Sequence, residues 1–77
     1  MAKTDVTISL SRDQALVLFE WLAREGKAET IPVAHPSEQR VLWELQAVLE
    51  KALPEPFASN YDEILAAARA RLTDAAG

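Results

Sequence analysis

The pattern of apolar and polar positions predicts one short strand followed by three helices. Over residues 6–10 apolar and polar residues alternate, and this period of two is typical of a strand with one buried face. The pattern then changes to the three-to-four-residue spacing of amphipathic helices in three further segments. These segments are residues 11–26, 37–53 and about 60–73. We therefore predict a mainly α domain, a small helical bundle of order βααα, with residues 1–5 and 73–77 frayed.

The first predicted helix has signals at both ends. Ser11, with Gln14 three residues later, predicts a capping box, and Gly26 is a usual residue at a helix C-terminus. The main apolar face consists of Ala15, Leu16, Leu18, Phe19, Leu22 and Ala23. Val17 and Trp21 lie on a separate side of the helix. The helix is thus apolar on two sides, which is more than one small core covers.

The second predicted helix has the clearest pattern and is expected to carry much of the core. Ser37 can cap its start, and Pro54 stops it because proline offers no N–H and restricts the preceding residue. Its apolar face consists of Val41, Leu42, Leu45, Val48, Leu49, Ala52 and Leu53. Trp43 lies on the opposite, polar side, and Phe57 in the following proline turn is expected to plug the core. The third helix presents Tyr61, Ile64, Leu65, Ala68, Leu72 and Ala75.

A lone strand needs a partner for its backbone N–H and C=O groups. Residues 29–34 are the other candidate strand in the chain, but Pro32 makes them a poor one. We therefore favour pairing of residues 6–10 with their copy in a second chain, and we predict a homodimer. The residues predicted to form the interface are Val6, Ile8, Leu10, Val17, Trp21 and Trp43. The alternative for the two tryptophans is that they cover the edges of the core.

Composition limits the class of protein. Seventy-seven residues form one domain with a marginal core, and without cysteine the remaining common support is oligomerisation. The hydrophobic share of 49% is high for so short a chain and favours folding over disorder. The net charge of −4 gives no general attraction to nucleic acid or anionic lipid. We expect a cytoplasmic protein, because the N-terminus lacks the apolar core of a signal peptide and no apolar run could span a bilayer.

Few residues offer chemistry. His35 is the single histidine, and with Glu38 it makes half of a metal site, whereas zinc takes three or four protein ligands. No pair of carboxylates stands out by its spacing, and two glycines cannot make a phosphate-binding loop. Four arginines are expected in surface ion pairs, namely Arg24, Arg40, Arg69 and Arg71. We predict no catalytic, cofactor-binding or metal-binding residue, no small-molecule substrate, and a protein that is not an enzyme.

The opening segment TDVTISLSRDQALVLFEWLAREGKA resembles the start of a ribbon–helix–helix DNA-binding protein. The resemblance covers residues 4–26, and the second helix by analogy. It implies that two chains pair their strands as an antiparallel ribbon, whose outward side chains Asp5, Thr7 and Ser9 enter the major groove. The chain departs from that pattern in its acidic Asp5, its connector of about ten residues, its third helix and its negative charge.

Two hypotheses of function follow. The leading one is a small, non-enzymatic interaction protein that forms a homodimer and binds another protein through apolar and tryptophan surfaces, with a basic partner suited to its charge. The alternative is a ribbon–helix–helix-like DNA-binding repressor or antitoxin.

Overall fold

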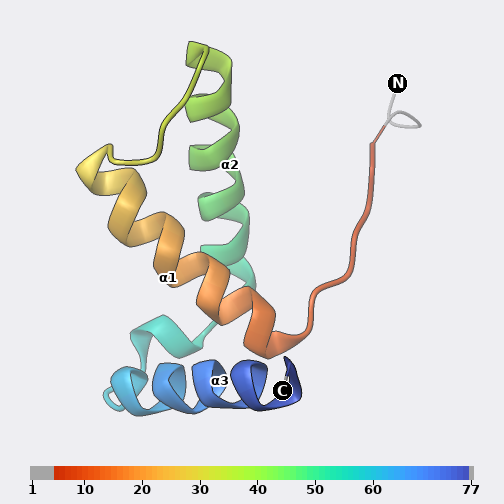
Figure 1. The fold of residues 1–77 in the computed structure, drawn as a ribbon, viewed down its shortest axis with the longest axis vertical. Coiled ribbons are helices and arrows are strands. Elements are labelled where there is room, and N and C mark those ends of the chain that lie inside the picture. Colours follow the sequence, from red (N-terminus) through yellow and green to blue (C-terminus); the bar gives the residue numbers. More distant parts are fainter. Residues whose placement is uncertain (1–4, 77) are drawn as a thin grey trace.

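The computed structural model describes residues 5–76 and shows a small, mainly helical domain, as the sequence predicted (Figure 1). The α-helices are α1 (Arg12–Ala28), α2 (Pro36–Ala52) and α3 (Tyr61–Ala76), and a 3₁₀ turn, η2 (Glu55–Phe57), precedes α3. Helix α3 continues past Thr73 to Ala76, and the other ends predicted to fray, residues 1–4 and 77, lie outside the described residues.

Helix α1 is the centre of the fold. Both α2 and α3 pack against it, whereas α2 and α3 barely touch each other. The core cluster consists of Leu16, Phe19, Leu22, Leu49, Leu53 and Ala68, and Leu65 is buried as well. The predicted main face of the first helix is therefore confirmed. The expectation that the second helix carries much of the core is wrong, because Val41 and Val48 are 58% and 63% exposed.

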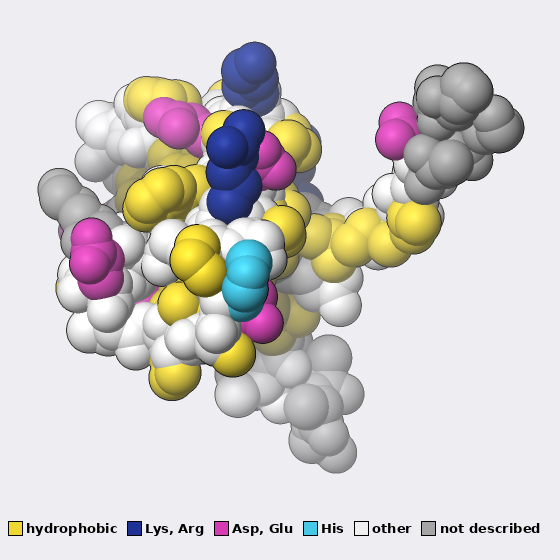
Figure 2. Space-filling view, turned by 90° about the horizontal axis from the view of Figure 1, so that it is seen from above, with side chains coloured by type: hydrophobic (Ala, Val, Ile, Leu, Met, Phe, Trp, Pro, Cys, Tyr) yellow, Lys and Arg dark blue, Asp and Glu magenta, His cyan; other side chains and the backbone are white. Residues whose placement is uncertain are grey.

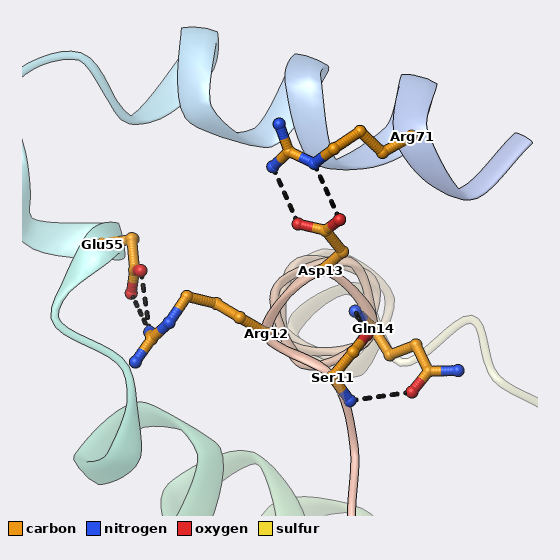
Figure 3. A network of polar contacts seen from close by, with 6 residues as sticks. All are labelled: Ser11, Arg12, Asp13, Gln14, Glu55 and Arg71. Carbon is orange, nitrogen blue, oxygen red and sulfur yellow. Dashed lines mark hydrogen bonds and ion pairs between the residues drawn. The ribbon is translucent and has the colours of Figure 1, made fainter. Parts of the chain in front are cut away.

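The start of α1 is capped as predicted. The Ser11 Oγ accepts a hydrogen bond from the Gln14 N–H at 3.1 Å, and the Gln14 Oε1 accepts one from the Ser11 N–H at 2.9 Å (Figure 3). These two bonds satisfy backbone donors that the first turn of a helix leaves free. They fix the point at which the chain changes from extended to helical.

The end of α1 differs from the prediction. The helix passes through Gly26 and ends at Ala28, and Glu29 takes the left-handed conformation at φ 56° and ψ 40°. Glu29 N–H donates to the Gly26 carbonyl at 3.2 Å, and Thr30 N–H donates to the Glu25 carbonyl at 3.1 Å, which is the Schellman pattern. Gly26 is instead a buried position facing α2, where an added Cβ would lie 3.7 Å from the Gln46 Oε1.

The start of α2 also differs. The N-cap is His35 and not Ser37: the His35 Nδ1 accepts a hydrogen bond from the Ser37 N–H at 3.0 Å. Pro36 occupies the first helical position, where its missing N–H costs nothing, and this moves the cap upstream. At the other end Leu53 is extended before Pro54, so the predicted stop is confirmed.

Helix α3 is fixed to the start of α1 by directional polar contacts (Figure 3). Arg71 donates two hydrogen bonds of 2.8 Å to the two carboxylate oxygens of Asp13. The Arg71 guanidinium, chiefly through this hydrogen bonding, lowers the pKa of Asp13 from its ordinary value of 3.8. Beside it, Arg12 and Glu55 form an ion pair of 2.7 Å between α1 and η2.

A third polar contact joins the middle of α1 to the start of α3. The Tyr61 hydroxyl donates to the Glu20 carboxylate at 2.9 Å, in a partly buried position. Burial, and then the hydrogen bond to Glu20, raise the pKa of Tyr61 to about 12, because both disfavour the phenolate.

Residues 5–11 form an extended arm that projects from the helical body (Figure 1). The predicted N-terminal strand is not formed in the single chain, because no backbone in the described part of the chain pairs with residues 5–10. The candidate partner, residues 29–34, belongs to the connector at the far end of α1 from the arm. Pairing within the chain is thus wrong, and pairing with a second chain stays a prediction.

Candidate interaction surface

The arm presents three of the six predicted interface residues. Val6 and Ile8 are 87% and 71% exposed, and Leu10 is also exposed. In the space-filling view, hydrophobic side chains (yellow) are exposed along the arm where it leaves the helical body (Figure 2). An extended backbone without partners that carries apolar side chains can accept another strand along its length.

The other three predicted residues do not join the arm in one patch. Val17 is partly buried and packs against the core cluster. Trp21 and Trp43 are 40% and 53% exposed, so each ring is about half covered by its own chain. Both interpretations of the tryptophans stay predictions, since each ring is partly covered by its own chain and also offers apolar surface.

Trp43 lies at a hollow between α1 and α2. The hollow is open and measures about 470 Å³, and its lining consists of Glu20, Ala23, Arg24, Gly26, Trp43 and Gln46. Trp21 does not line this hollow, although it lies only about 60° around α1 from the lining residue Arg24. The hollow therefore involves Trp43 and not Trp21.

The sequence reasoning missed an apolar surface on α2. The stripe Val41, Leu45, Val48 and Ala52, here called the α2 stripe, was assigned to the core of the chain. Leu45 is half-buried, whereas the other three residues are exposed. The signal was present in the width of the apolar face of this helix, which is broader than one neighbouring helix covers. Phe57, predicted to plug the core, is also largely exposed in η2.

A second hollow adjoins the α2 stripe at the start of α2. It measures about 400 Å³ and is mainly apolar, and its lining consists of Ile31, Pro32, Val33, Ser37, Glu38, Val41 and Leu42. Val33 in the connector is exposed beside it. The apolar surface therefore extends from the connector along one flank of α2.

Four ion pairs form among the described residues, and two of them join neighbouring residues of one helix. Three of the four arginines form the expected surface ion pairs, which are Arg24 with Glu25, Arg40 with Glu44, and Arg71 with Asp13. Arg69 is exposed on α3. Exposed pairs of this kind contribute little to stability, so the apolar surfaces above are the more informative features.

The residues that suggested chemistry in the sequence have structural roles at the start of α2. Within residues 5–76 no group of three His, Cys, Asp or Glu side chains could hold a metal ion. His35 and Glu38 both serve the start of α2, because the Glu38 Oε1 accepts a hydrogen bond from the Ala34 N–H at 2.6 Å. None of the helices in that part of the chain is long and apolar enough to cross a membrane.

With this geometry established, comparison with known proteins adds no relative. The chain matches no protein-family model, no curated protein and no solved structure. The resemblance to ribbon–helix–helix proteins rests on the residues quoted for it.

Proposed function

We propose that the protein is a small, non-enzymatic interaction module that forms a homodimer and binds another protein through its exposed apolar side chains. The observation that carries this proposal is the arm. Val6 and Ile8 are almost fully exposed on an extended segment, and no backbone in the described chain pairs with residues 5–10. Burying each side chain would stabilise an assembly by about 1.5–3 kcal/mol, before the cost of ordering the arm.

In the proposed dimer the arms of two copies pair as antiparallel strands. Val6, Ile8 and Leu10 then lie on one face of the two-stranded ribbon, directed toward the helices, and Thr7 and Ser9 lie on the other face. This arrangement supplies the backbone partner that the single chain lacks.

Binding of a different protein would use surfaces that the ribbon leaves open. Trp43 at its hollow is the best candidate anchor, since tryptophan is enriched in the energetically important parts of interfaces. The net charge of −4 suits a basic partner. Trp43→Ala is expected to weaken binding to such a partner and leave the mass of the dimer unchanged.

Light scattering on an eluting column tests the homodimer. The wild type is expected at about twice the chain mass of 8.5 kDa, and Val6→Asp/Ile8→Asp at the monomer mass. Thr7→Asp/Ser9→Asp is the matched control, because it adds the same charge to the same arm on the other face of the ribbon, and it should remain dimeric. A wild type that stays monomeric at millimolar concentration rules the homodimer out.

A ribbon-type DNA-binding protein is the second candidate. It is favoured by the order of the elements, in which a free extended arm leads through a capping box into a helix pair. It predicts retardation of DNA at low salt that weakens steeply as salt is added, and a loss of binding in Thr7→Ala/Ser9→Ala. No retardation of random-sequence DNA or of the gene's own promoter at low salt would exclude it.

A further inference from the structure

The α2 stripe has the spacing of a helix–helix seam. Its residues follow one another at intervals of four, three and four, which is the heptad pattern of positions that meet in coiled coils. On one edge of the stripe Leu42 and Leu49 pack toward α1 and the core. On the other edge lie the exposed Glu44 and Lys51. The stripe is therefore an apolar seam that continues the core outward and ends in a charged border.

We propose that the α2 stripe is covered by α2 of a second copy, packed antiparallel about a two-fold axis. This inference rests on the proposed homodimer and assigns it a contact that does not involve the arm. In this arrangement Val41 faces Ala52 of the second copy, and Leu45 faces Val48 of the second copy, so every apolar position of the stripe meets another. A stripe of about 16 Å, from Val41 to Ala52, is matched in length by itself.

The charged border selects a second copy in the antiparallel direction. Glu44 and Lys51 occupy equivalent positions one heptad apart, on the edge away from α1. Antiparallel packing brings Glu44 of each copy beside Lys51 of the other, which gives two opposite-charge pairs by symmetry. In parallel two-fold packing the charged edge of each copy would lie beside the Leu42–Leu49 edge of the other, which packs on α1, so no such pair forms. Glu44 is 61% exposed in its contact with Arg40, so its carboxylate stays accessible to a second copy.

The seam leaves the hollow at Trp43 free. Trp43 lies two residues from Val41, which places it about 160° around the helix from that end of the seam. A dimer formed through the α2 stripe therefore keeps the Trp43 side open, where the other protein is proposed to bind.

The first test compares two neighbouring substitutions that add the same charge. Val48→Glu places a carboxylate in the seam, and the dissociation constant of the dimer is expected to rise about a hundredfold or more. Ala47→Glu, at an exposed position off the seam, should leave it within about threefold of the wild type. Circular dichroism confirms that both variants are folded, and sedimentation across a concentration series gives the constants.

The second test exchanges the border charges. Glu44→Lys and Lys51→Glu should each raise the dissociation constant about tenfold, because each sets like charges together twice in the dimer. The double variant Glu44→Lys/Lys51→Glu should return it toward the wild-type value. Residues 44 and 51 are two turns apart within one helix and cannot pair directly, and the contact of residue 44 with Arg40 stays lost. Recovery therefore reports contact between copies.

The outcomes separate this inference from the proposal it rests on. A Val48→Glu protein that dimerises like the wild type, while Val6→Asp/Ile8→Asp is monomeric, overturns the seam and keeps the homodimer; the α2 stripe would then belong to another protein's helix. Loss of the dimer in Val48→Glu without recovery in the charge exchange overturns the antiparallel arrangement. A monomeric wild type overturns both.

Discussion

Helices α1 and α2 have the same length and a similar amphipathic pattern, but different neighbours pack against them. Both have 17 residues, both are amphipathic, and both carry apolar side chains beyond a single narrow face. Helix α1 is packed on two sides, by α2 and by α3, whereas α2 is packed on α1 alone. The number of neighbours, more than the apolar pattern, determines how much of each helix is buried.

The two contacts of α1 also differ in kind. Toward α3 it makes the pairs Asp13–Arg71 and Glu20–Tyr61, and both are directional. Between α1 and α2 no hydrogen bond forms among the side chains that the structure describes, and the contact is apolar with an open hollow at its edge. The contact between α1 and α3 therefore combines apolar packing, centred on Ala68, with directional polar bonds, whereas the contact between α1 and α2 is apolar.

Truncating one apolar residue on each helix is the most direct test of this difference in burial. Leu22 of α1 is 1% exposed, so Leu22→Ala should reduce the free energy of unfolding by about 2–5 kcal/mol, enough to unfold so small a domain at room temperature. Val48→Ala on α2 should change it by no more than about 0.5 kcal/mol in the monomer. Urea unfolding followed by circular dichroism, at concentrations below dimer formation, measures both. Equal losses would mean that α2 is as well covered as α1.

Substitutions at the end of α1 test its left-handed cap and how closely α2 approaches it. Glu29→Gly should stabilise the domain by about 1 kcal/mol, since glycine takes the left-handed conformation without the steric cost that other residues bear. Gly26→Ala should stabilise by a similar amount of about 1 kcal/mol through helix propensity, because its Cβ would make an ordinary contact with Gln46. Glu29→Ala is the control and should bring no gain. Thermal unfolding detects the shifts, and a loss of stability in Gly26→Ala would show a tighter approach of α2.

The smallest effect concerns the polar side of α1. Tyr61 is the single tyrosine, so the ultraviolet absorbance of phenolate should titrate with a midpoint near 12 instead of the ordinary 10. A pKa raised by folding contributes stability that is full below pH 10 and is lost as the pH rises toward 12. Tyr61→Phe should abolish the titration and cost about 1 kcal/mol of stability near neutral pH. A midpoint at 10 in the folded protein would mean that Tyr61 is free of Glu20.

The sequence predicted the local features better than their arrangement. The capping box at Ser11, the stop before Pro54 and the buried face of α1 follow from neighbouring residues, and all three are confirmed. Gly26 and Ser37 were assigned to helix ends by residue type, but packing against α2 and the position of Pro36 decided otherwise. Residue types show where a helix can begin or end, and tertiary contacts determine which of these positions is the actual end.

The candidate surface shows the same division. A helical wheel identified the wide apolar face of α2 but could not show that α1 would cover only the side with Leu49, leaving Val41 and Val48 exposed. The alternation at residues 6–10 predicted a segment in need of a partner, and the arm finds none in the described chain. The pattern predicted that both segments need a partner, and it did not show how little of either the chain itself would cover.

The sparse contact between α2 and α3 bears on the order in which the molecule forms. Apart from the short segment with η2 that connects them, the two helices meet mainly through α1, which supplies three of the buried core residues, Leu16, Phe19 and Leu22. The α1–α2 hairpin closes a short loop and can form first, whereas the contact of α3 with the start of α1 joins residues 58 apart, as between Asp13 and Arg71. We therefore expect helix α3 to dock last, after α1 and α2 have paired.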